Sequence, residues 1–348
     1  MKAVTFDEFA GPLSISDVPE PTPSSDGAVI EVRATGICRS DWHGWQGHDE
    51  DIQSFPHVPG HEFVGVVVLV GPEVRYWKPG DRVTMPFVAG CGHCPECAIG
   101  NHQICDNQFQ AGFTAWGSFA ERVTVRYADV NLVRLPDELD DVTAASLGCR
   151  MATAYRAITQ QGRIRPGDWV AVHGCGGVGL SAVAIATAHG ARPIAIDIRP
   201  EPLRLATELG AAATVNASET DDVPAAVRDI TSRGAHVSID ALGSQITVTN
   251  SILSLRKRGR HVQVGLLAGD QANPPLPMGP VIANELEIVG SHGLAAHAYP
   301  ELLDLVLTGR VEASKLVTRK LTLEEAPQAL ATLDDHAGVG VAVIDRFG

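Results

Sequence analysis

The strongest constraint on the fold is an alternation of short apolar strands with helices that begins at Asp168. The first strand is expected over 169–173, and the helix that follows it over 180–189. The scheme then repeats, with strands expected over 193–197, 236–240, 260–264 and 286–289 and helices over 202–209 and 245–255. Strands that alternate with helices imply right-handed crossovers and a parallel sheet covered on both faces. The pattern therefore predicts an α/β, doubly wound domain with a nucleotide-binding layout.

A glycine-rich turn joins the first of these strands to its helix. Its residues fit the pattern G-x-G-x-x-G and include Gly174, Gly176, Gly177, Val178 and Gly179. In this context the glycines permit a tight turn and bring backbone N–H groups close to a pyrophosphate at the positive end of the helix. The turn therefore predicts a dinucleotide site, and the alternative is a parallel sheet whose glycine turn binds nothing.

Two residues at the end of the next strand, Asp197 and Arg199, indicate which dinucleotide is bound. Asp197 closes that strand and is expected to accept the adenosine ribose hydroxyls. Because a carboxylate there repels a 2′-phosphate, we expect NAD in preference to NADP. Arg199 is either a stacking or solvated residue or a partial rescue of phosphate binding.

The first part of the chain, about residues 1–150, has a different rhythm. Short apolar runs broken by Gly and Pro occur over 28–34, 62–70, 81–85 and 119–125. Such runs predict a β-rich domain, with metal ligands on its loops. Beyond residue 290 we expect one helix over 299–307 and then apolar pieces that rejoin the first domain. The predicted catalytic domain is thus discontinuous, residues 1–150 and 291–348, and the dinucleotide-binding domain spans residues 151–290.

Four cysteines lie close together in the β-rich part: Cys91, Cys94, Cys97 and Cys105. Four thiolates close a tetrahedron around zinc and leave no position for water or substrate, which is typical of a structural site. We therefore expect one structural zinc ion here. The seventh cysteine of the chain, Cys175, lies in the glycine-rich turn and is interpreted as a small filler residue.

A second, dispersed set consists of Cys38, His61 with its neighbour Glu62, and Cys149. Two thiolates and one imidazole leave the fourth position of a zinc ion open, and chemistry on a bound oxygen requires an open position. This set is the candidate active site, so two zinc ions per chain are expected.

Composition excludes several classes of partner. The 27 basic and 41 acidic side chains give a net charge of −14, which disfavours nucleic acid and anionic membranes as partners. The N-terminal residues carry acid where a signal peptide has an apolar core, so we expect no export and a cytoplasmic location. Seven cysteines, an odd number, favour thiolate ligation in a reducing compartment over a disulfide framework.

Several motifs together resemble the zinc-dependent medium-chain alcohol dehydrogenases, over essentially the whole chain. They are Cys38-Arg39-Ser40-Asp41-Trp42-His43, Pro59-Gly60-His61-Glu62, the four-cysteine segment, Gly148-Cys149 and the glycine-rich turn. The fold that this resemblance implies is a GroES-like β-rich catalytic domain joined to a Rossmann domain. It also implies that Cys38, His61 and Cys149 hold the catalytic zinc.

Other roles follow from the same resemblance. Ser40 and His43 would form a proton relay from the substrate oxygen to solvent, and Asp41 would orient the ring of His61. Glu62 resembles a family acid that approaches the metal during ligand exchange. Arg39 would bind the cofactor pyrophosphate, for which a guanidinium is suited, and Thr153 would lie beside the nicotinamide.

Aromatic residues are the candidates for a substrate pocket. Phe87 matches a pocket-wall position of the family, and Trp45, Trp116 and Phe119 are candidates to line the same cleft. Aromatic walls favour an apolar substituent on the carbinol carbon. Ordinary core packing is the other interpretation of each of them.

The predicted function is an NAD-dependent zinc alcohol dehydrogenase that interconverts a small primary or secondary alcohol with its carbonyl compound. In this chemistry a zinc-bound alcohol loses its proton near neutral pH, and the alkoxide expels hydride towards the nicotinamide. Polyol, threonine or aldehyde-type dehydrogenases of the same family are alternatives, although Cys149 favours a simple alcohol dehydrogenase. A non-catalytic, zinc-stabilised nucleotide-binding protein and a cysteine-based redox sensor are alternatives of other classes. By resemblance the chain forms a homo-oligomer, a dimer or a tetramer.

Overall fold

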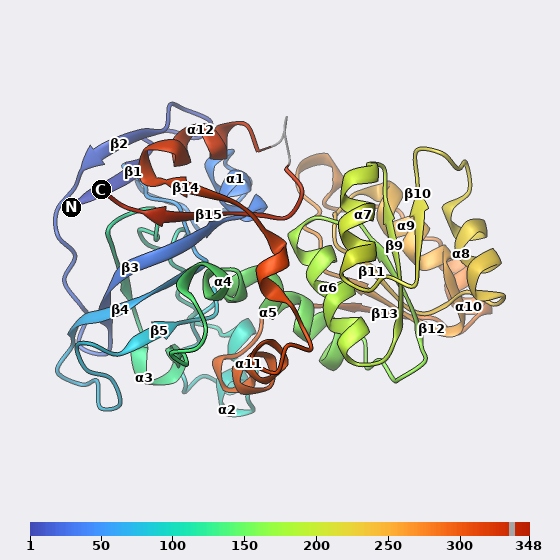
Figure 1. Cartoon of the computed structure of the whole chain (residues 1–348), viewed down its shortest axis with the longest axis horizontal. Helices are drawn as coiled ribbons and strands as arrows, with labels where there is room; N and C mark the ends of the chain where they lie inside the picture. Colours follow the sequence, from blue (N-terminus) through green and yellow to red (C-terminus); the bar gives the residue numbers. More distant parts are fainter. Residues whose placement is uncertain (334–337) are drawn as a thin grey trace. The chain divides into compact units, whose positions relative to one another are not determined.

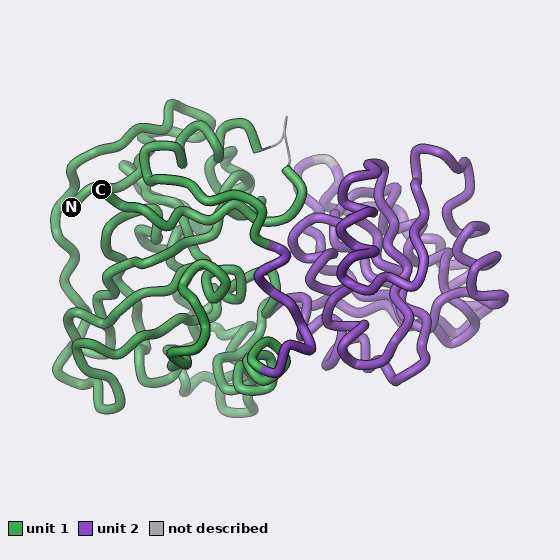
Figure 2. The backbone as a smooth tube through the Cα atoms, viewed as in Figure 1, with its two compact units in different colours: residues 1–152, 293–307, 317–348 green, residues 153–292, 308–316 purple. Residues whose placement is uncertain are grey.

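A computed structural model describes residues 1–333 and 338–348, which form two compact units (Figure 2). Unit 1 comprises Met1–Ala152, Gly293–Leu307 and Val317–Gly348, and unit 2 comprises Thr153–His292 and Thr308–Leu316. The domain limits derived from the sequence stay predictions. Residues 334–337, within the predicted segment 291–348, lie outside the described residues.

Unit 1 is built on a largely antiparallel sheet (Figure 1). In the described residues its strand order is β14 (Val317–Thr322), β15 (Val341–Arg346), β3 (Ala28–Ile37), β4 (Phe63–Val70), β5 (Arg82–Thr84) and β7 (Val133–Arg134). β6 (Arg122–Val125) also pairs with β3, and β1 (Lys2–Thr5) pairs with β2 (Ser14–Asp17) in a separate hairpin. The prediction of a β-rich domain is therefore confirmed.

The register of β3 against β4 places the first two candidate ligands side by side. The strands are antiparallel, and Thr35 near the end of β3 lies opposite Phe63 at the start of β4. Because the chain leaves β3 at the same edge where it enters β4, Cys38 and His61 meet there. Apolar side chains such as Ile30 and Phe63 pack together beneath this pair of strands and fix it in place.

The helices of unit 1 are short. They are α1 (Arg39–Trp45), α2 (Pro95–Ala98), α3 (Ala128–Asn131), α4 (Asp141–Ala145), α11 (Tyr299–Leu307) and α12 (Ala326–Ala331). Single 3-10 turns occur at His102–Ile104, Ala296–Ala298 and Leu323–Glu325, and a π-helical turn spans Leu147–Met151. The chain then continues through α5 (Ala152–Tyr155) into unit 2. The predicted helix over 299–307 coincides with α11.

Unit 2 contains a parallel sheet of six strands among the described residues (Figure 1). Its order is β10 (Ala213–Asn216), β9 (Arg192–Asp197), β8 (Trp169–His173), β11 (Ala235–Asp240), β12 (Leu255–Gln263) and β13 (Glu287–Gly290). Its helices are α6 (Gly177–Ala188), α7 (Pro200–Glu208), α8 (Val223–Thr231), α9 (Gln245–Leu253) and α10 (Met278–Ala283). This order, which reverses direction between β8 and β11, confirms the predicted doubly wound domain.

Remaining elements of unit 2 are a π-helical stretch, Arg156–Gln161, and 3-10 turns at Gly269–Gln271 and Ala313–Leu316. Two predicted starts in unit 2 were wrong by three residues or more. α6 begins at Gly177 rather than at residue 180. Glycines are poor helix formers, so the sequence did not indicate that Gly177 and Gly179 belong to the first turn of this helix. β12 begins at Leu255 rather than at residue 260. Its first half contains exposed basic residues and so lacks the apolar pattern of a buried strand, although it belongs to the same strand beside the buried β11.

Candidate active site and metal centres

Cys38 lies where β3 ends and α1 begins. It is the N-cap of α1, and its backbone N–H donates to Asp41 Oδ2 over 2.8 Å, which closes a capping box. A capping box fixes the direction in which the chain enters a helix. The sulfur of Cys38 is thereby held at a defined point beyond the sheet.

The same carboxylate holds His61. Nδ1 of His61 donates to Asp41 Oδ1 over 2.8 Å, and the N–H of Gly60 donates to the same oxygen over 3.0 Å. In the neutral ring with its proton on Nδ1, which is the form that can bind a metal, the lone pair is on Nε2. Nε2 is buried and has no hydrogen-bond partner among the described residues. Asp41 therefore connects two candidate ligands and leaves Nε2 of His61 available to bind a metal.

Cys149 lies within the π-helical turn Leu147–Met151 rather than on a loop as predicted. A π-helical turn keeps the chain helical but holds one more residue per hydrogen-bonded turn than an α-helix. Tyr299 of α11, fully buried, donates its hydroxyl to the carbonyl of Gly148 over 3.0 Å. This contact supports the turn that carries Cys149.

The three donors converge. The ligand atoms of Cys38, His61 and Cys149 all lie within 4.8 Å of one another, and all three residues are buried. A hydrogen bond from Cys149 lowers the pKa of Cys38 well below its usual value, against the effect of burial, and the same contact raises the pKa of Cys149. Burial alone would lower the pKa of His61, but Asp41 outweighs burial and raises it. Two sulfurs and one nitrogen form the donor set of an open zinc site.

A buried ion pair lies behind these donors. Both oxygens of Glu62 are occupied: Oε1 accepts from the backbone N–H groups of Cys149 and Arg150 over 3.1 and 3.0 Å, and Oε2 pairs with the Arg150 guanidinium. Nη1 of Arg150 also donates to the carbonyl of Ile37 over 2.7 Å. Burial lowers the pKa of Arg150, but Glu62 and Cys38 outweigh it, so this pKa lies above its usual value.

Sequence reasoning missed Arg150. The available signal was a single arginine inside the apolar run from Leu147 to Ala154, matched by a single acid, Glu62, before the apolar strand β4. Two opposite charges, each alone in an apolar run, are expected to pair when both are buried.

The predicted relay residues lie on α1. Ser40 Oγ is 3.8 Å from Cys38 Sγ, and His43 follows one helical turn later. Nδ1 of His43 lies 3.0 Å from Nδ1 of His48, a contact that the sequence did not indicate. Arg39 is exposed, with its guanidinium carbon 4.4 Å from the centre of the Trp42 ring.

The predicted pocket residues fall into different environments. Phe87 is half-buried, and its ring centre lies 6.0 Å from that of His61. Phe113, which was not predicted, lies 5.2 Å from the same ring. Trp45 and Phe119 are buried in a core cluster, and Trp116 is half-buried with its ring N–H on the carbonyl of Pro56.

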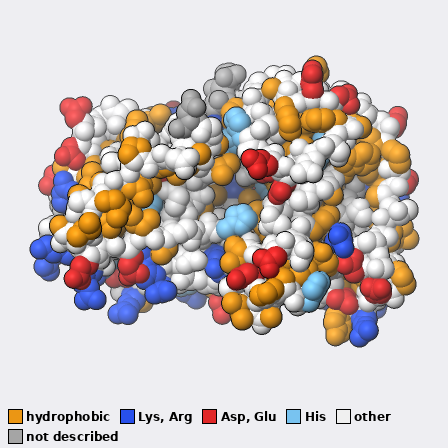
Figure 3. Space-filling model, turned by 180° about the vertical axis from the view of Figure 1, so that it is seen from behind, with side chains coloured by type: hydrophobic (Ala, Val, Ile, Leu, Met, Phe, Trp, Pro, Cys, Tyr) orange, Lys and Arg blue, Asp and Glu red, His pale blue; other side chains and the backbone are white. Residues whose placement is uncertain are grey.

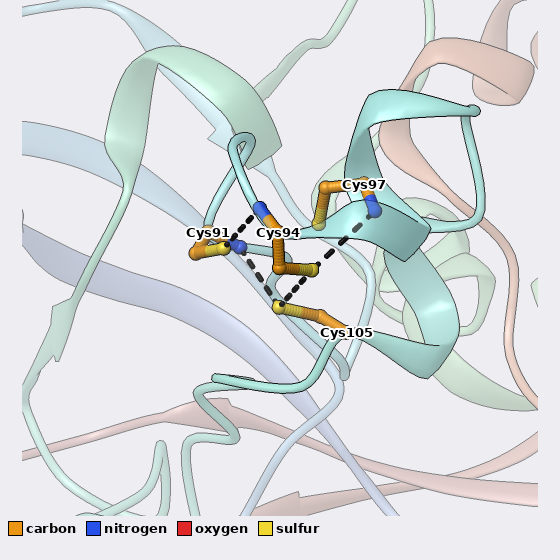
Figure 4. A group of neighbouring side chains, drawn as sticks. All are labelled: Cys91, Cys94, Cys97 and Cys105. Atoms are coloured by element: carbon orange, nitrogen blue, oxygen red, sulfur yellow. Dashed lines mark hydrogen bonds between the residues drawn. The ribbon is translucent and has the colours of Figure 1, made fainter.

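The compact site is a separate group of four buried sulfurs in unit 1 (Figure 4). Ligand atoms of Cys91, Cys94, Cys97 and Cys105 all lie within 4.8 Å of one another. Backbone N–H groups point at the sulfurs, including Cys91 N–H at Cys105 Sγ over 3.2 Å. Against the effect of burial, these contacts and the neighbouring thiols lower the pKa of Cys91 to about 7. Four sulfurs complete a tetrahedral zinc site with no open position.

In unit 2 the glycine turn lies at the carboxyl end of β8. Gly174 has φ +88°, and a Cβ on Gly179 would overlap the carbonyl of Gly174, so neither position accepts a side chain. Gly176 is the exposed N-cap of α6, while Gly177 and Val178, in its first turn, are half-buried.

Asp197, at the end of β9, reaches this turn. Its Oδ2 accepts the N–H of Cys175 over 2.8 Å, and its Oδ1 accepts the N–H of Arg199 over 3.0 Å. Nε of Arg199 lies 4.0 Å from Oδ1. Thr153, in α5, is buried, and its hydroxyl has no hydrogen-bond partner among the described residues.

Comparisons with known proteins agree over the whole chain. The family pattern "Alcohol dehydrogenase GroES-like domain" matches residues 24–137, and "Zinc-binding dehydrogenase" matches residues 177–308. An NAD-dependent alcohol dehydrogenase of Sulfurisphaera tokodaii is 33% identical over 99% of both chains. The solved alcohol dehydrogenase TADH from Thermus sp. ATN1 is 33% identical, with a TM-score of 0.91 over 100% of both chains.

Another solved structure, a zinc-binding dehydrogenase from Sinorhizobium meliloti 1021 bound to NADP, is 30% identical and covers 99% of this chain and 98% of its own, with a TM-score of 0.88. The GroES-like and Rossmann assignments are therefore confirmed. With a closed four-cysteine site and an open Cys-His-Cys site in the described residues, this chain belongs to the zinc-binding medium-chain alcohol dehydrogenase family, whose members are oxidoreductases that act on CH–OH groups.

Proposed function

We propose that this chain is a zinc- and NAD-dependent alcohol dehydrogenase that interconverts a primary or secondary alcohol with its aldehyde or ketone. The observation that carries the proposal is the convergence of Cys38, His61 and Cys149, whose ligand atoms lie within 4.8 Å of one another. Family membership supports the same chemistry.

These residues fit a zinc ion. Nε2 of His61 is buried without a hydrogen-bond partner among the described residues, a costly arrangement unless a hydrogen-bond donor or a Lewis acid such as zinc meets its lone pair. Cys38 ionises readily, which suits a metal ligand. When bound, zinc supplies a Lewis acid that makes a substrate hydroxyl more acidic and a carbonyl more electrophilic.

Residues of α1 handle the proton. Ser40 Oγ, 3.8 Å from Cys38 Sγ, accepts the proton of the substrate hydroxyl in the oxidation and returns it in the reduction. His43, three residues later on the same helix, receives it and exchanges it with solvent, since imidazole titrates near neutral pH.

The glycine turn and Asp197 fit a dinucleotide. Gly176 has open space where a side chain would stand, so the backbone at the start of α6 is open to a pyrophosphate. Asp197 retains lone pairs for ribose hydroxyls and repels a 2′-phosphate, although Arg199 at 4.0 Å weakens the repulsion. A dinucleotide held here would supply the hydride acceptor for the carbinol carbon. By resemblance, Arg39 contacts the pyrophosphate and Thr153 lies beside the nicotinamide.

Specificity rests on the aromatic rings around His61. Phe87 and Phe113 both face the imidazole, with ring centres 6.0 and 5.2 Å away. Rings at this position favour an apolar substituent on the carbinol carbon. Trp45, Trp116 and Phe119 stay predictions as pocket residues, and the core packing of Trp45 and Phe119 favours a structural role for those two.

We also propose a homo-oligomer, a dimer or a tetramer. α10 has no buried residue, and its side chains Met278 and Ile282 are exposed, as is Ile288 of the edge strand β13. An exposed apolar edge strand is a surface on which a second copy can pair.

The remaining partner predictions concern location and charge. All seven cysteines are free and buried, which suits a reducing compartment such as the cytoplasm. In the described part of the chain, no helix has the length and apolar character needed to cross a bilayer. On the face drawn in Figure 3, acidic and basic side chains are interspersed. A small alcohol or carbonyl compound is therefore the proposed partner, rather than nucleic acid.

A panel of alcohols and carbonyl compounds, assayed with NAD and with NADP beside a measured zinc-to-protein ratio, tests the proposal. We expect about two zinc ions per chain and faster turnover with NAD. Turnover with NADP as the better cofactor would overturn the role of Asp197. A chain that holds zinc and turns over none of the panel would overturn the dehydrogenase assignment.

A further inference from the structure

The three candidate ligands belong to three segments of unit 1 that meet only by folding. Cys38 follows β3, His61 precedes β4, and Cys149 lies in the π-helical turn. Asp41 joins the first two through its bonds to Cys38 N–H and His61 Nδ1. Among the described residues its hydrogen bonds go to Cys38, Gly60 and His61 and not to the Cys149 segment, so another element must set the position of the third ligand.

The Glu62–Arg150 pair touches all three segments, each at a ligand or at the residue next to one. Nη1 of Arg150 donates to the carbonyl of Ile37, immediately before Cys38, over 2.7 Å. Nη2 pairs with Glu62 Oε2, immediately after His61. Glu62 Oε1 accepts the N–H of Cys149 itself over 3.1 Å. The link from Cys149 to the other two ligands therefore passes through this pair.

The pair is buried and closely fitted. The exposed fractions of the Arg150 and Glu62 side chains are 7% and 0%. A Cβ on Gly36 would overlap both the Glu62 carboxylate and the Arg150 guanidinium, so strand β3 gives the pair its space by lacking a side chain there. Removal of either residue would leave the other as a buried charge without a partner, which is strongly destabilising, so Arg150 and Glu62 depend on each other.

A guanidinium suits this position for a geometric reason. Its two terminal nitrogens point in fixed directions, one to the Ile37 carbonyl and one to Glu62, while its Nε–H has no partner among the described residues. An ammonium group is a compact point charge and does not reproduce this fork. Both carboxylate oxygens of Glu62 accept hydrogen bonds in these contacts, and Glu62 is not part of the group of converging ligand atoms, which is Cys38, His61 and Cys149.

We propose that Arg150 is a positioning residue of the open metal site, which together with Glu62 clamps the three ligand-bearing segments and holds the Glu62 carboxylate away from the metal. The inference rests on the proposed function, because it takes Cys38, His61 and Cys149 as the ligands. It assigns to Glu62 a partner within this chain, whereas the resemblance assigned it an approach to the metal.

Zinc retention tests the clamp without reliance on activity. Wild type, Arg150→Gln, Arg150→Lys and Glu62→Gln are purified, their zinc content per chain is measured, and zinc transfer to an excess of a chromogenic chelator is followed by absorbance. Arg82→Gln is the matched control, because the Arg82 side chain also pairs with a carboxylate, Asp141, and donates to backbone carbonyls, those of Pro136 and Leu139, but among the described residues it makes no hydrogen bond to a ligand or to a residue next to one.

In Arg150→Gln we expect one of the two zinc ions to be held about 10–100-fold more weakly, as is typical when a group that orients metal ligands is lost. The zinc of the four-cysteine site should be released at the wild-type rate and so serves as an internal reference. Arg150→Lys should fall between wild type and Arg150→Gln, and Glu62→Gln should weaken the same site. The Arg82→Gln control should match wild type at both sites.

Equal zinc release from wild type, Arg150→Gln and Arg150→Lys would overturn the inference, and so would a parallel loss of both zinc ions, which would mean general destabilisation. If Arg150→Gln does not fold, the folded Arg150→Lys and Glu62→Gln proteins decide the question by the same measurement. A wild type that holds two zinc ions but oxidises no alcohol would overturn the proposed function and leave the clamp intact. A wild type with only the four-cysteine zinc would overturn both.

Discussion

The four-cysteine site and the Cys-His-Cys site differ in what holds their donors in place. Cys91, Cys94, Cys97 and Cys105 lie in one short segment, and backbone N–H groups of that same segment point at their sulfurs. The donors of the open site come from the end of a strand, the start of another and a helical turn. Their positions depend on side chains that bridge segments, namely Asp41, Glu62 and Arg150.

This contrast matches the chemistry of each site. A closed site contributes folding energy through the metal itself, so the metal can organise a local loop. An open site has one protein ligand fewer and must hold its geometry while a fourth ligand is exchanged, so rigidity comes from the surrounding hydrogen bonds. The two sites should therefore respond differently when a ligand, or a residue behind a ligand, is changed.

The largest expected effect follows from Cys149→Ala. Loss of one of three ligands should remove zinc from the open site and lower turnover by about 10³-fold or more, since the Lewis acid contributes several kcal/mol to the barrier. The zinc content should fall from about two to about one per chain. Folding, followed by circular dichroism, and NAD binding, followed by fluorescence titration, should change little. Wild-type turnover in this variant would remove Cys149 from the ligand set.

Cys94→Ala should act on stability instead. Loss of a ligand of the closed site should lower the unfolding free energy by at least about 3 kcal/mol, or roughly 6–12 °C in the thermal midpoint, because metal binding there is coupled to folding. Differential scanning calorimetry measures this shift. Cys175→Ala is the control, since Cys175 is buried but belongs to neither cysteine group. A loss of turnover at unchanged stability would contradict the structural assignment.

A smaller and more selective effect is expected for Asp41→Asn. The carboxylate of Asp41 accepts hydrogen bonds from Cys38, Gly60 and His61, whereas the side-chain nitrogen of Asn can only donate. Zinc affinity at the open site should therefore fall about 10–100-fold, while the four-cysteine zinc is retained. Competition with a chelator of known affinity measures it. Asp129→Asn, which also removes a carboxylate that accepts two backbone N–H groups, should leave both zinc sites unchanged. Similar losses in the two variants would show that Asp41 acts only through stability.

Local patterns predicted much of unit 2 and part of unit 1. The strand expected over 169–173 and the helix expected over 299–307 coincide with β8 and α11, because apolar periodicity dominates in both. The start of α6 was placed too late, since glycines disfavour helix unless the fold requires them there. Cys149 was assigned to a loop because a π-helical turn has no simple sequence signal.

The open site illustrates the same limit. Spacing and residue type were enough to name Cys38, His61 and Cys149, and the structure brings their ligand atoms together. Arg150 and Tyr299, which support the Cys149 turn, were not named, because nothing in their local sequence says which distant carbonyl or carboxylate they reach. Phe113 was missed for the same reason.

The sequence by itself determined the donor sets, the glycine turn with its acid, and the alternation that specifies a parallel sheet, because each depends on residue type and short spacing along the chain. Only the tertiary structure decided which buried groups join the three ligand segments, since a hydrogen bond between residues 37 and 150, or 62 and 149, depends on strand pairing and packing far from either residue. Directional contacts in a buried site are set by three-dimensional position, and local sequence does not encode that position.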